Sequence, residues 1–115
     1  MHISVHQRML AMTDAQLCEA FDGDILYDCH HIRTRVSRSD AGRKLRLNAR
    51  GTLPVIVTHL ENHRRLDEPG PPEDLRLGWG LLLNWIAVDL GAIDSAPEFR
   101  TDTLGWIAWA KKIAA

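Results

Sequence analysis

Apolar residues recur at helical intervals along much of the chain, and this pattern predicts a mainly α-helical fold. Thr13, with Gln16 three positions later, forms a capping-box pattern that predicts the start of a helix, and Gly23 is predicted to end it. A short helix is also expected ahead of it, from about residue 4. The next helix has the clearest pattern, because four apolar residues follow intervals of four, three and four, as on one helical face. They are Ile25, Cys29, Ile32 and Val36, and the helix should end near residues 39–42.

The C-terminal third carries a second helical pattern. One predicted helix has its apolar face at Leu75, Trp79, Leu82, Ile86 and Leu90. Gly91 is predicted to end this helix, and Ser95 with Glu98 forms another capping-box pattern that predicts the start of the last one. The apolar face of that last helix would comprise Phe99, Trp106, Ile107, Ala110 and Ile113. Lys111 and Lys112 suit its negative C-terminal end.

These helices predict two units that pack as one compact domain. Residues 1–66 form the N-terminal unit, and residues 73–115 form a Trp-rich helical hairpin packed on it. The Pro-rich run at residues 67–72 is the expected linker, because proline cannot continue a helix. The whole chain of 115 residues is long enough for one ordinary core. We therefore expect about five helices in all.

The segment 44–58 allows two interpretations. Its first half alternates apolar and polar residues, as in a strand, and its second half is β-branched, with the turn residues 48–51 between them. This pattern predicts a small β-hairpin. The alternative is a helix that is capped at Thr52 and runs to Leu66, with Pro54 in its first turn. The hairpin is the preferred interpretation.

Charge is distributed unevenly although the formal net charge is only −1. Residues 33–50 hold seven basic residues and one acid, whereas residues 14–28 hold five acids and no base. Such a split is more informative than the total, because a local basic patch attracts phosphates even on a neutral protein. The basic segment is therefore either the candidate binding region or a polar face that only contacts solvent.

The order of these segments resembles that of winged helix-turn-helix DNA-binding proteins over residues 1–58. QLCEAF, residues 16–21, is similar to the positioning helix of that family, and HHIRTRVSRSDAGR, residues 30–43, is similar to its recognition helix. Residues 44–58 would be the wing. The resemblance implies a small non-enzymatic regulatory protein that binds double-stranded DNA, with arginines reading bases and Ser, Thr and Lys holding phosphates. The implied contact residues are Arg33, Thr34, Arg35, Ser37, Arg38, Arg43, Lys44, Arg46 and Arg50.

A second class of function follows from the tryptophans, all four of which lie in the C-terminal third. Trp79 and Trp106 fit the apolar faces, whereas Trp85 and Trp109 lie toward the edges of those faces. Aromatic residues are enriched at the centres of protein interfaces. The alternative is therefore an all-helical interaction module without nucleic-acid contact, like the inhibitors and adaptors of phages and mobile elements. It would bind a protein partner or a second copy of itself through Trp85 and Trp109.

Other chemistry finds little support in the sequence. No GxSxG, GxxxxGK or GxGxxG motif occurs, so we expect no enzyme and no cofactor. His59 and His63 would share a helical face, but no recognised zinc spacing is present, and we expect no metal. Cys18 and Cys29 are predicted to be core thiols. No secretory signal and no membrane span are apparent, which predicts a cytoplasmic protein.

Overall fold

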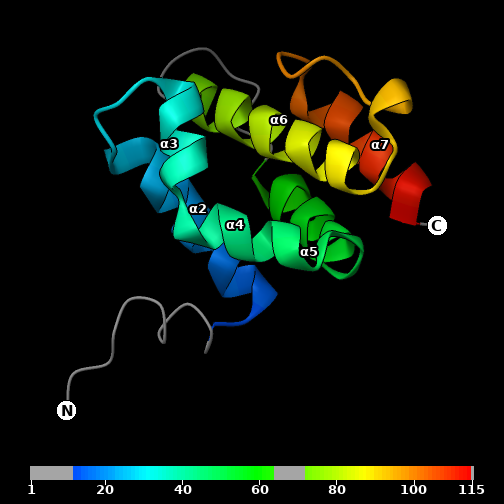
Figure 1. Cartoon of the computed structure of the whole chain (residues 1–115), viewed down its shortest axis with the longest axis horizontal. Coiled ribbons are helices and arrows are strands. Elements are labelled where there is room, and N and C mark those ends of the chain that lie inside the picture. Colours follow the sequence, from blue (N-terminus) through cyan, green and yellow to red (C-terminus); the bar gives the residue numbers. More distant parts are fainter. Residues whose placement is uncertain (1–11, 64–71, 115) are drawn as a thin grey trace.

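The computed structural model describes residues 12–63 and 72–114, and these form an all-α globule (Figure 1). Within these ranges there are six α-helices, one 3₁₀-helix and no strand. The α-helices are α2 (Asp14–Tyr27), α3 (Ile32–Arg38), α4 (Asp40–Leu47), α5 (Ala49–Asn62), α6 (Pro72–Asp89) and α7 (Thr103–Ala114). The 3₁₀-helix is η2 (Ile93–Ser95). The mainly α prediction is confirmed. The helix expected from residue 4 begins outside the described residues, as do residues 67–71 of the linker expected at 67–72, whereas Pro72 is the first residue of α6.

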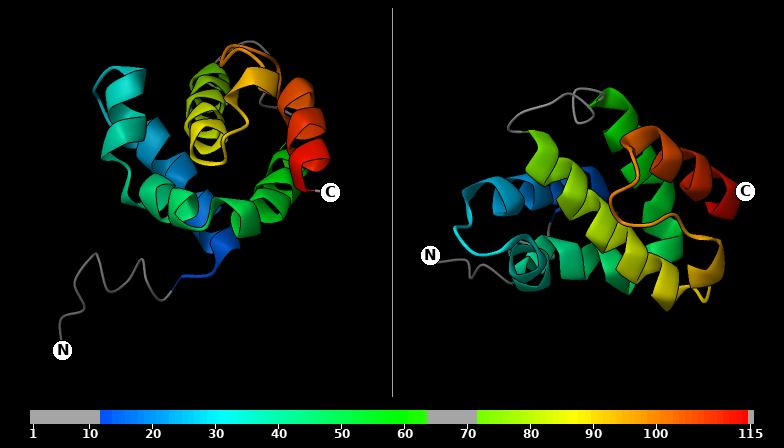
Figure 2. Two further views of the ribbon diagram at one scale, coloured as in Figure 1. Left: turned by 45° about the vertical axis from the view of Figure 1, so that its right-hand side comes forward. Right: turned by 90° about the horizontal axis from the view of Figure 1, so that it is seen from above.

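Helix α6 runs through the centre of the molecule. Figure 2 shows α3, α4 and α5 following one another in an arc around it, with α7 beside α5. The centre of α6 is buried on several sides, through Trp79, Leu81, Leu82, Leu83, Ile86 and Ala87. The ring of Trp79 meets the ring of Phe21 on α2 edge-on, with centroids 4.6 Å apart. The N-terminal and C-terminal halves therefore share one core.

Helix α2 starts as the capping box predicts. The Oγ1 of Thr13 accepts from the Gln16 N–H at 3.2 Å, and the Gln16 side chain accepts from the Thr13 N–H at 2.9 Å. The expected stop at Gly23 is wrong, because α2 continues to Tyr27. Its buried face extends through that glycine to Ile25. This burial outweighs the ~1 kcal/mol by which glycine disfavours a helix interior.

The single helix expected between residues 25 and 39 is wrong. Ile25 belongs to the end of α2, Cys29 is exposed in a loop, and α3 begins only at Ile32. The break occurs at Asp28, whose carboxylate accepts from the His30 N–H at 2.8 Å. Such a local side-chain bond competes with the helical one.

A second break separates α3 from α4 at Ser39, which is buried and has extended backbone angles. Its Oγ accepts from the N–H of Gly42 at 3.0 Å and so caps α4. The predicted recognition helix is therefore divided between two short helices.

The β-hairpin expected at residues 44–58 is also wrong, and with it the wing, because this segment lies in α4 and α5. Leu45 is buried whereas Leu47 is 76% exposed, so these two leucines do not share a face as they would in a strand. The helical alternative is correct in kind, although α5 begins at Ala49, earlier than the Thr52 expected, and ends at Asn62, before the Leu66 expected. Thr52 lies inside the helix and donates to the carbonyl of Leu45 at 2.9 Å. Pro54 is tolerated in α5 on the exposed side.

The helix predicted at α6 is correct, whereas the last helix begins later than predicted. Gly91, with φ of +69°, follows the end of α6 as expected. The predicted cap at Ser95 is wrong, since α7 starts at Thr103 and Asp102 Oδ1 accepts from the Gly105 N–H. The loop between them passes close to α6, where a Cβ on Gly80 would overlap with the carbonyl of Phe99. Lys111 and Lys112 lie in the last turn of α7, as predicted.

Candidate functional site

The nine side chains predicted to bind nucleic acid lie on three consecutive helices, α3, α4 and the first turn of α5. Two of the arginines are joined to α6 by carboxylates. Arg35 Nη1 lies 3.0 Å from Asp74 Oδ2. The Nε and Nη2 of Arg46 donate to the two carboxylate oxygens of Asp89 at 2.9 and 3.1 Å. These pairs hold α3 and α4 against the central helix.

Arg35 has a further structural role at the end of α2. Its side chain is only 19% exposed, and it donates to the carbonyl oxygens of Ile25, at 3.1 Å, and of His30. A guanidinium that satisfies the last carbonyls of a helix compensates for hydrogen bonds the helix cannot make itself. Arg35 is therefore engaged within the chain rather than presented to a ligand.

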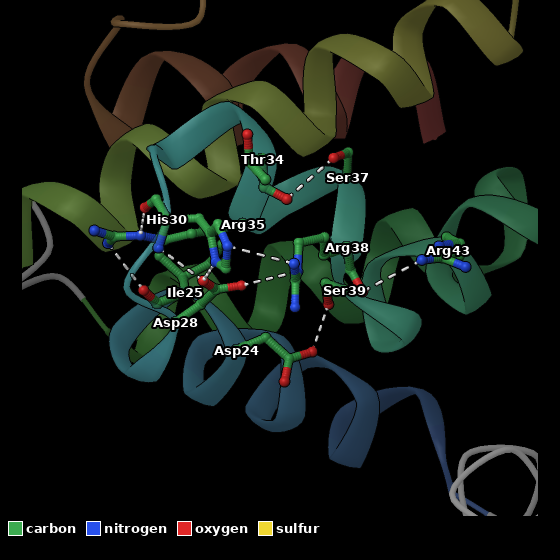
Figure 3. Close-up of polar contacts among 10 residues, drawn as sticks. All are labelled: Asp24, Ile25, Asp28, His30, Thr34, Arg35, Ser37, Arg38, Ser39 and Arg43. Carbon is green, nitrogen blue, oxygen red and sulfur yellow. Dashed lines mark hydrogen bonds and ion pairs between the residues drawn. The ribbon is translucent and has the colours of Figure 1, made fainter.

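A polar groove of about 690 Å³ lies where α2 ends and α3 meets α4 (Figure 3). Arg38 crosses it, with its Nε 3.5 Å from Asp28 Oδ2 and its Nη1 3.5 Å from His30 Nε2. The Oγ of Ser39 donates to Asp24 Oδ2 at 2.6 Å on the α2 side. The groove is lined by Gly23, Asp24, Tyr27, Asp28, Cys29, His30, Arg35, Arg38, Ser39 and Asp40.

The charges in this groove are mixed. The pKa of Asp28 is held below its ordinary value, chiefly by the backbone N–H and ring of His30, with a smaller contribution from Arg38. Asp24 and Asp40 add two more carboxyl groups to its lining. An anionic ligand would therefore meet carboxylates as well as Arg38, which makes this groove poorly suited to a phosphate chain.

The two cysteines occupy different environments. Cys18 is buried in the core as predicted, and burial raises the pKa of its thiol to about 12. The core position predicted for Cys29 is wrong, because the loop between α2 and α3 leaves it exposed. The thiol of Cys18 is thus protonated and covered, whereas that of Cys29 lies at the groove.

A second surface lies between α4 and α6 and includes Trp85. The indole is half-buried, with the guanidinium carbon of Arg46 5.2 Å from its ring centroid. A small cavity of about 160 Å³ beside it is lined by Val36, Ser37, Gly42, Arg43, Arg46, Leu82 and Trp85. Two exposed apolar side chains lie on the same two helices. Leu47 follows Arg43 by one turn of α4, and Val88, which is 56% exposed, follows Trp85 by one turn of α6. We call Arg43, Arg46, Leu47, Trp85 and Val88 the Trp85 face.

The other predicted interface residue, Trp109, is covered by the chain itself. Trp109 is only 6% exposed, and its Nε1 donates to Ser95 Oγ at 3.1 Å. Its ring also meets that of Trp106 edge-on at 5.5 Å. Trp109 closes the core between α7 and η2, and it offers almost no area to a partner.

The remaining residues predicted to contact nucleic acid differ in whether their side chains pair with other groups of the chain. Arg43 pairs loosely with Asp40 at 3.5 Å, and both side chains are more than half exposed. Arg33 lies over the ring of Phe99 at 4.9 Å. Within the described ranges, Arg33, Lys44 and Arg50 have no carboxylate partner. On the polar side of α3, Ser37 Oγ donates to the carbonyl of Thr34 at 3.0 Å.

One cluster was not predicted, because its members are far apart in the sequence. Asp22 of α2 approaches His59 and His63 at the C-terminal end of α5. The spacing of the two histidines on one helical face was the only signal available from the sequence, and it did not point to a carboxylate 37 positions earlier.

Among the helices in the described ranges, none combines the length and apolar character needed to cross a bilayer. Comparison of the chain with protein-family models, with curated proteins and with solved structures gives no significant match.

Proposed function

We propose that the chain is a non-enzymatic regulatory protein that binds a protein partner through the Trp85 face. One observation carries this proposal: a half-buried tryptophan stands beside two arginines, with the exposed side chains of Leu47 and Val88 on the same pair of helices. Trp and Arg are the residues most enriched where interface binding energy concentrates. Leu47 and Val88 would gain burial from any partner that covers Trp85.

The geometry of Arg46 supports a preformed contact surface. Its guanidinium is fixed by both oxygens of Asp89 and lies over the indole of Trp85. Ordering a long side chain on association costs roughly 0.5–1.5 kcal/mol, and here the fold has already restricted it. A partner would therefore meet a rigid aromatic and guanidinium pair.

The charge around this face indicates the chemistry of the partner. Arg43 has only a loose pair with Asp40, and Lys44, next to it on α4, pairs with no carboxylate in the described part of the chain. A complementary surface would carry apolar side chains surrounded by Asp and Glu. We expect a protein surface of this acidic and apolar kind.

The experiment uses two exposed positions, so that folding is preserved. The wild-type protein and the variants Leu47→Glu and Val88→Glu serve as baits in cell extract, and a protein retained only by the wild type is identified and purified. Its titration should give a defined affinity that Trp85→Ala weakens by at least about 30-fold, corresponding to 2 kcal/mol. Leu104→Glu is the matched control, since Leu104 is 61% exposed on α7. Equal binding by all variants would refute the proposal.

Double-stranded DNA is the second candidate ligand. Its supporting observation is the exposure of Arg33, Arg38, Arg43 and Arg50 along consecutive helices. Four contacts to phosphates would give a slope of roughly −3.6 for log affinity against log salt. Anisotropy titrations with duplex DNA decide between the two. Such a slope, reduced by Arg43→Gln and Arg50→Gln but unaffected by Leu47→Glu, would favour DNA over a protein partner.

A further inference from the structure

Three side chains from two helices converge at the junction of α2 and the end of α5. A ring nitrogen of His59, a ring nitrogen of His63 and a carboxylate oxygen of Asp22 lie within 4.8 Å of one another. We propose that these residues bind a first-row divalent metal ion, with Zn²⁺ the best match to two imidazoles and one carboxylate. This site is independent of the proposed partner-binding face.

The ligand spacing is close to what one ion requires. His59 and His63 are one helical turn apart, and their ring centroids are 4.3 Å apart. His59 Nε2 and Asp22 Oδ2 are separated by 2.8 Å. Metal–nitrogen and metal–oxygen bonds near 2.0–2.2 Å place neighbouring ligand atoms roughly 3.0–3.5 Å apart. A shift of a few tenths of an ångström would admit the ion between Asp22 and His59.

Hydrogen bonds already orient two of the ligands, Asp22 and His63. Trp79 Nε1 donates to Asp22 Oδ1 at 2.7 Å, which leaves Oδ2 directed at His59. His63 Nδ1 lies 2.6 Å from the carbonyl oxygen of His59. Because a carbonyl can only accept, this Nδ1 carries the hydrogen, and the neutral ring keeps its lone pair on Nε2. Metal-binding histidines commonly donate their second nitrogen to a backbone carbonyl or carboxylate in this way.

The cluster lies at the edge of the core. His59 is buried and Asp22 is mostly covered, whereas His63 is exposed. An ion held here would have two ligands fixed by packing and one at the surface, with room for water on the outer side. Three protein ligands plus water is the arrangement of an open zinc site.

A second cluster of ligand-type atoms, from Asp28, Cys29 and His30, is less suited to a cation. The guanidinium of Arg38 lies 3.5 Å from both Asp28 and His30. A permanent positive charge at that distance repels a metal ion and competes for the same carboxylate. For this reason the proposal concerns Asp22, His59 and His63 alone.

Binding has a definite proton balance. An ionised Asp22 can only accept, so the 2.8 Å contact places a hydrogen on His59 Nε2. In a neutral imidazole this hydrogen moves to Nδ1 through water as the Nε2 lone pair forms the bond to the metal, so the ring stays neutral and releases no net proton. A proton leaves to solvent only from an imidazole that carried both ring hydrogens before the metal bound.

Calorimetric titration of the full chain with Zn²⁺ tests the site. We expect one ion per chain and a melting temperature raised by several degrees. Loss of a residue that hydrogen-bonds to a metal ligand typically weakens metal binding by roughly 10–100-fold. His63→Ala removes a ligand itself, so it should weaken Zn²⁺ binding by more than this. Asp22→Asn, which retains an acceptor for Trp79, should also weaken it. His31→Ala and Cys29→Ser are controls and should bind within about twofold of wild type.

Cobalt(II) identifies the ligands directly. The proposal predicts visible d–d bands without the near-ultraviolet band of a cobalt–thiolate bond, and these bands should be lost in His63→Ala and kept in Cys29→Ser. A thiolate band, or Zn²⁺ binding to His63→Ala with wild-type affinity, would overturn the proposal. Absence of stoichiometric Zn²⁺ binding by the wild type would overturn it as well.

Discussion

Arg46 holds Asp89 through two hydrogen bonds of 2.9 and 3.1 Å, and this pair joins α4 to the end of the central helix α6. The hydrogen bond to Asp89 raises the pKa of Arg46 further above its ordinary value, so the guanidinium stays charged. The same guanidinium lies over Trp85. The ion pair therefore both stabilises the α4–α6 contact and presents the aromatic ring of the Trp85 face.

Loss of this pair should have a modest effect on stability. Both side chains are about one third exposed, so Arg46→Met or Asp89→Asn should lower the free energy of unfolding by about 1 kcal/mol. Arg46→Lys should not restore it, because lysine provides neither the two-pronged contact nor the stacking on Trp85. Urea denaturation of the three variants measures this. If Arg46→Lys were as stable as wild type, the positive charge alone would account for the contribution of Arg46 to stability.

The helical structure of residues 44–62 has a sharp test in two neighbouring leucines. Leu45 is fully buried and Leu47 is 76% exposed. Leu45→Ala should therefore cost about 2–5 kcal/mol of stability, whereas Leu47→Ala should change it by no more than about 0.5 kcal/mol. In a hairpin the two residues would lie on one face of a strand, and both substitutions would cost alike. Denaturant midpoints of the two variants distinguish these structures.

The thiols should differ strongly in reactivity. Cys29 is exposed, while Cys18 is buried with its pKa raised to about 12. A disulfide reagent at neutral pH should modify one thiol per chain quickly, and the second only at the rate of unfolding. Cys29→Ser should remove the fast phase and Cys18→Ala should leave it. Two fast phases in the wild type would contradict the core position of Cys18.

Asp28 should make stability depend on acidity. Its pKa is lowered from the ordinary value of 3.8 by the hydrogen bonds from His30 and by Arg38. A carboxyl group with a lowered pKa binds its proton more readily when unfolded, so its stabilising contribution is present above about pH 4 and declines as pH falls below that value. Denaturation of wild type and Asp28→Asn between pH 2 and 6 tests this. The stability difference between them should shrink toward acid pH, and a constant difference would contradict the assignment.

Some local signals in the sequence predicted local structure correctly, whereas the stop at Gly23 and the cap at Ser95 were wrong. The capping box of Thr13 and Gln16 and the end of α6 near Gly91 depend on residues within a few positions of one another. The end of a helix near Ser39 was also expected. The break at Asp28 was missed, because the apolar spacing continues across it. At Asp28 a side-chain hydrogen bond to the backbone interrupts the helix although the hydrophobic pattern does not.

The candidate sites were harder to predict, because they depend on contacts between distant residues. The arginines of α3 and α4 were recognisable as a basic run, but their partners Asp74 and Asp89 follow 39 and 43 positions later. Asp22 and His59 are similarly 37 positions apart. Sequence periodicity places a side chain on a helical face, whereas only the packing of helices decides which carboxylate stands opposite it.

A photoreactive amino acid placed at position 47 in the intact chain gives the sharpest test of contact with a protein through the Trp85 face. We expect one protein adduct from position 47, its loss when Val88→Glu is added, and no such adduct from position 104. Purified partner should reproduce the same adduct. Equal adducts from positions 47 and 104, adducts that survive Val88→Glu, or adducts with nucleic acid alone would contradict it.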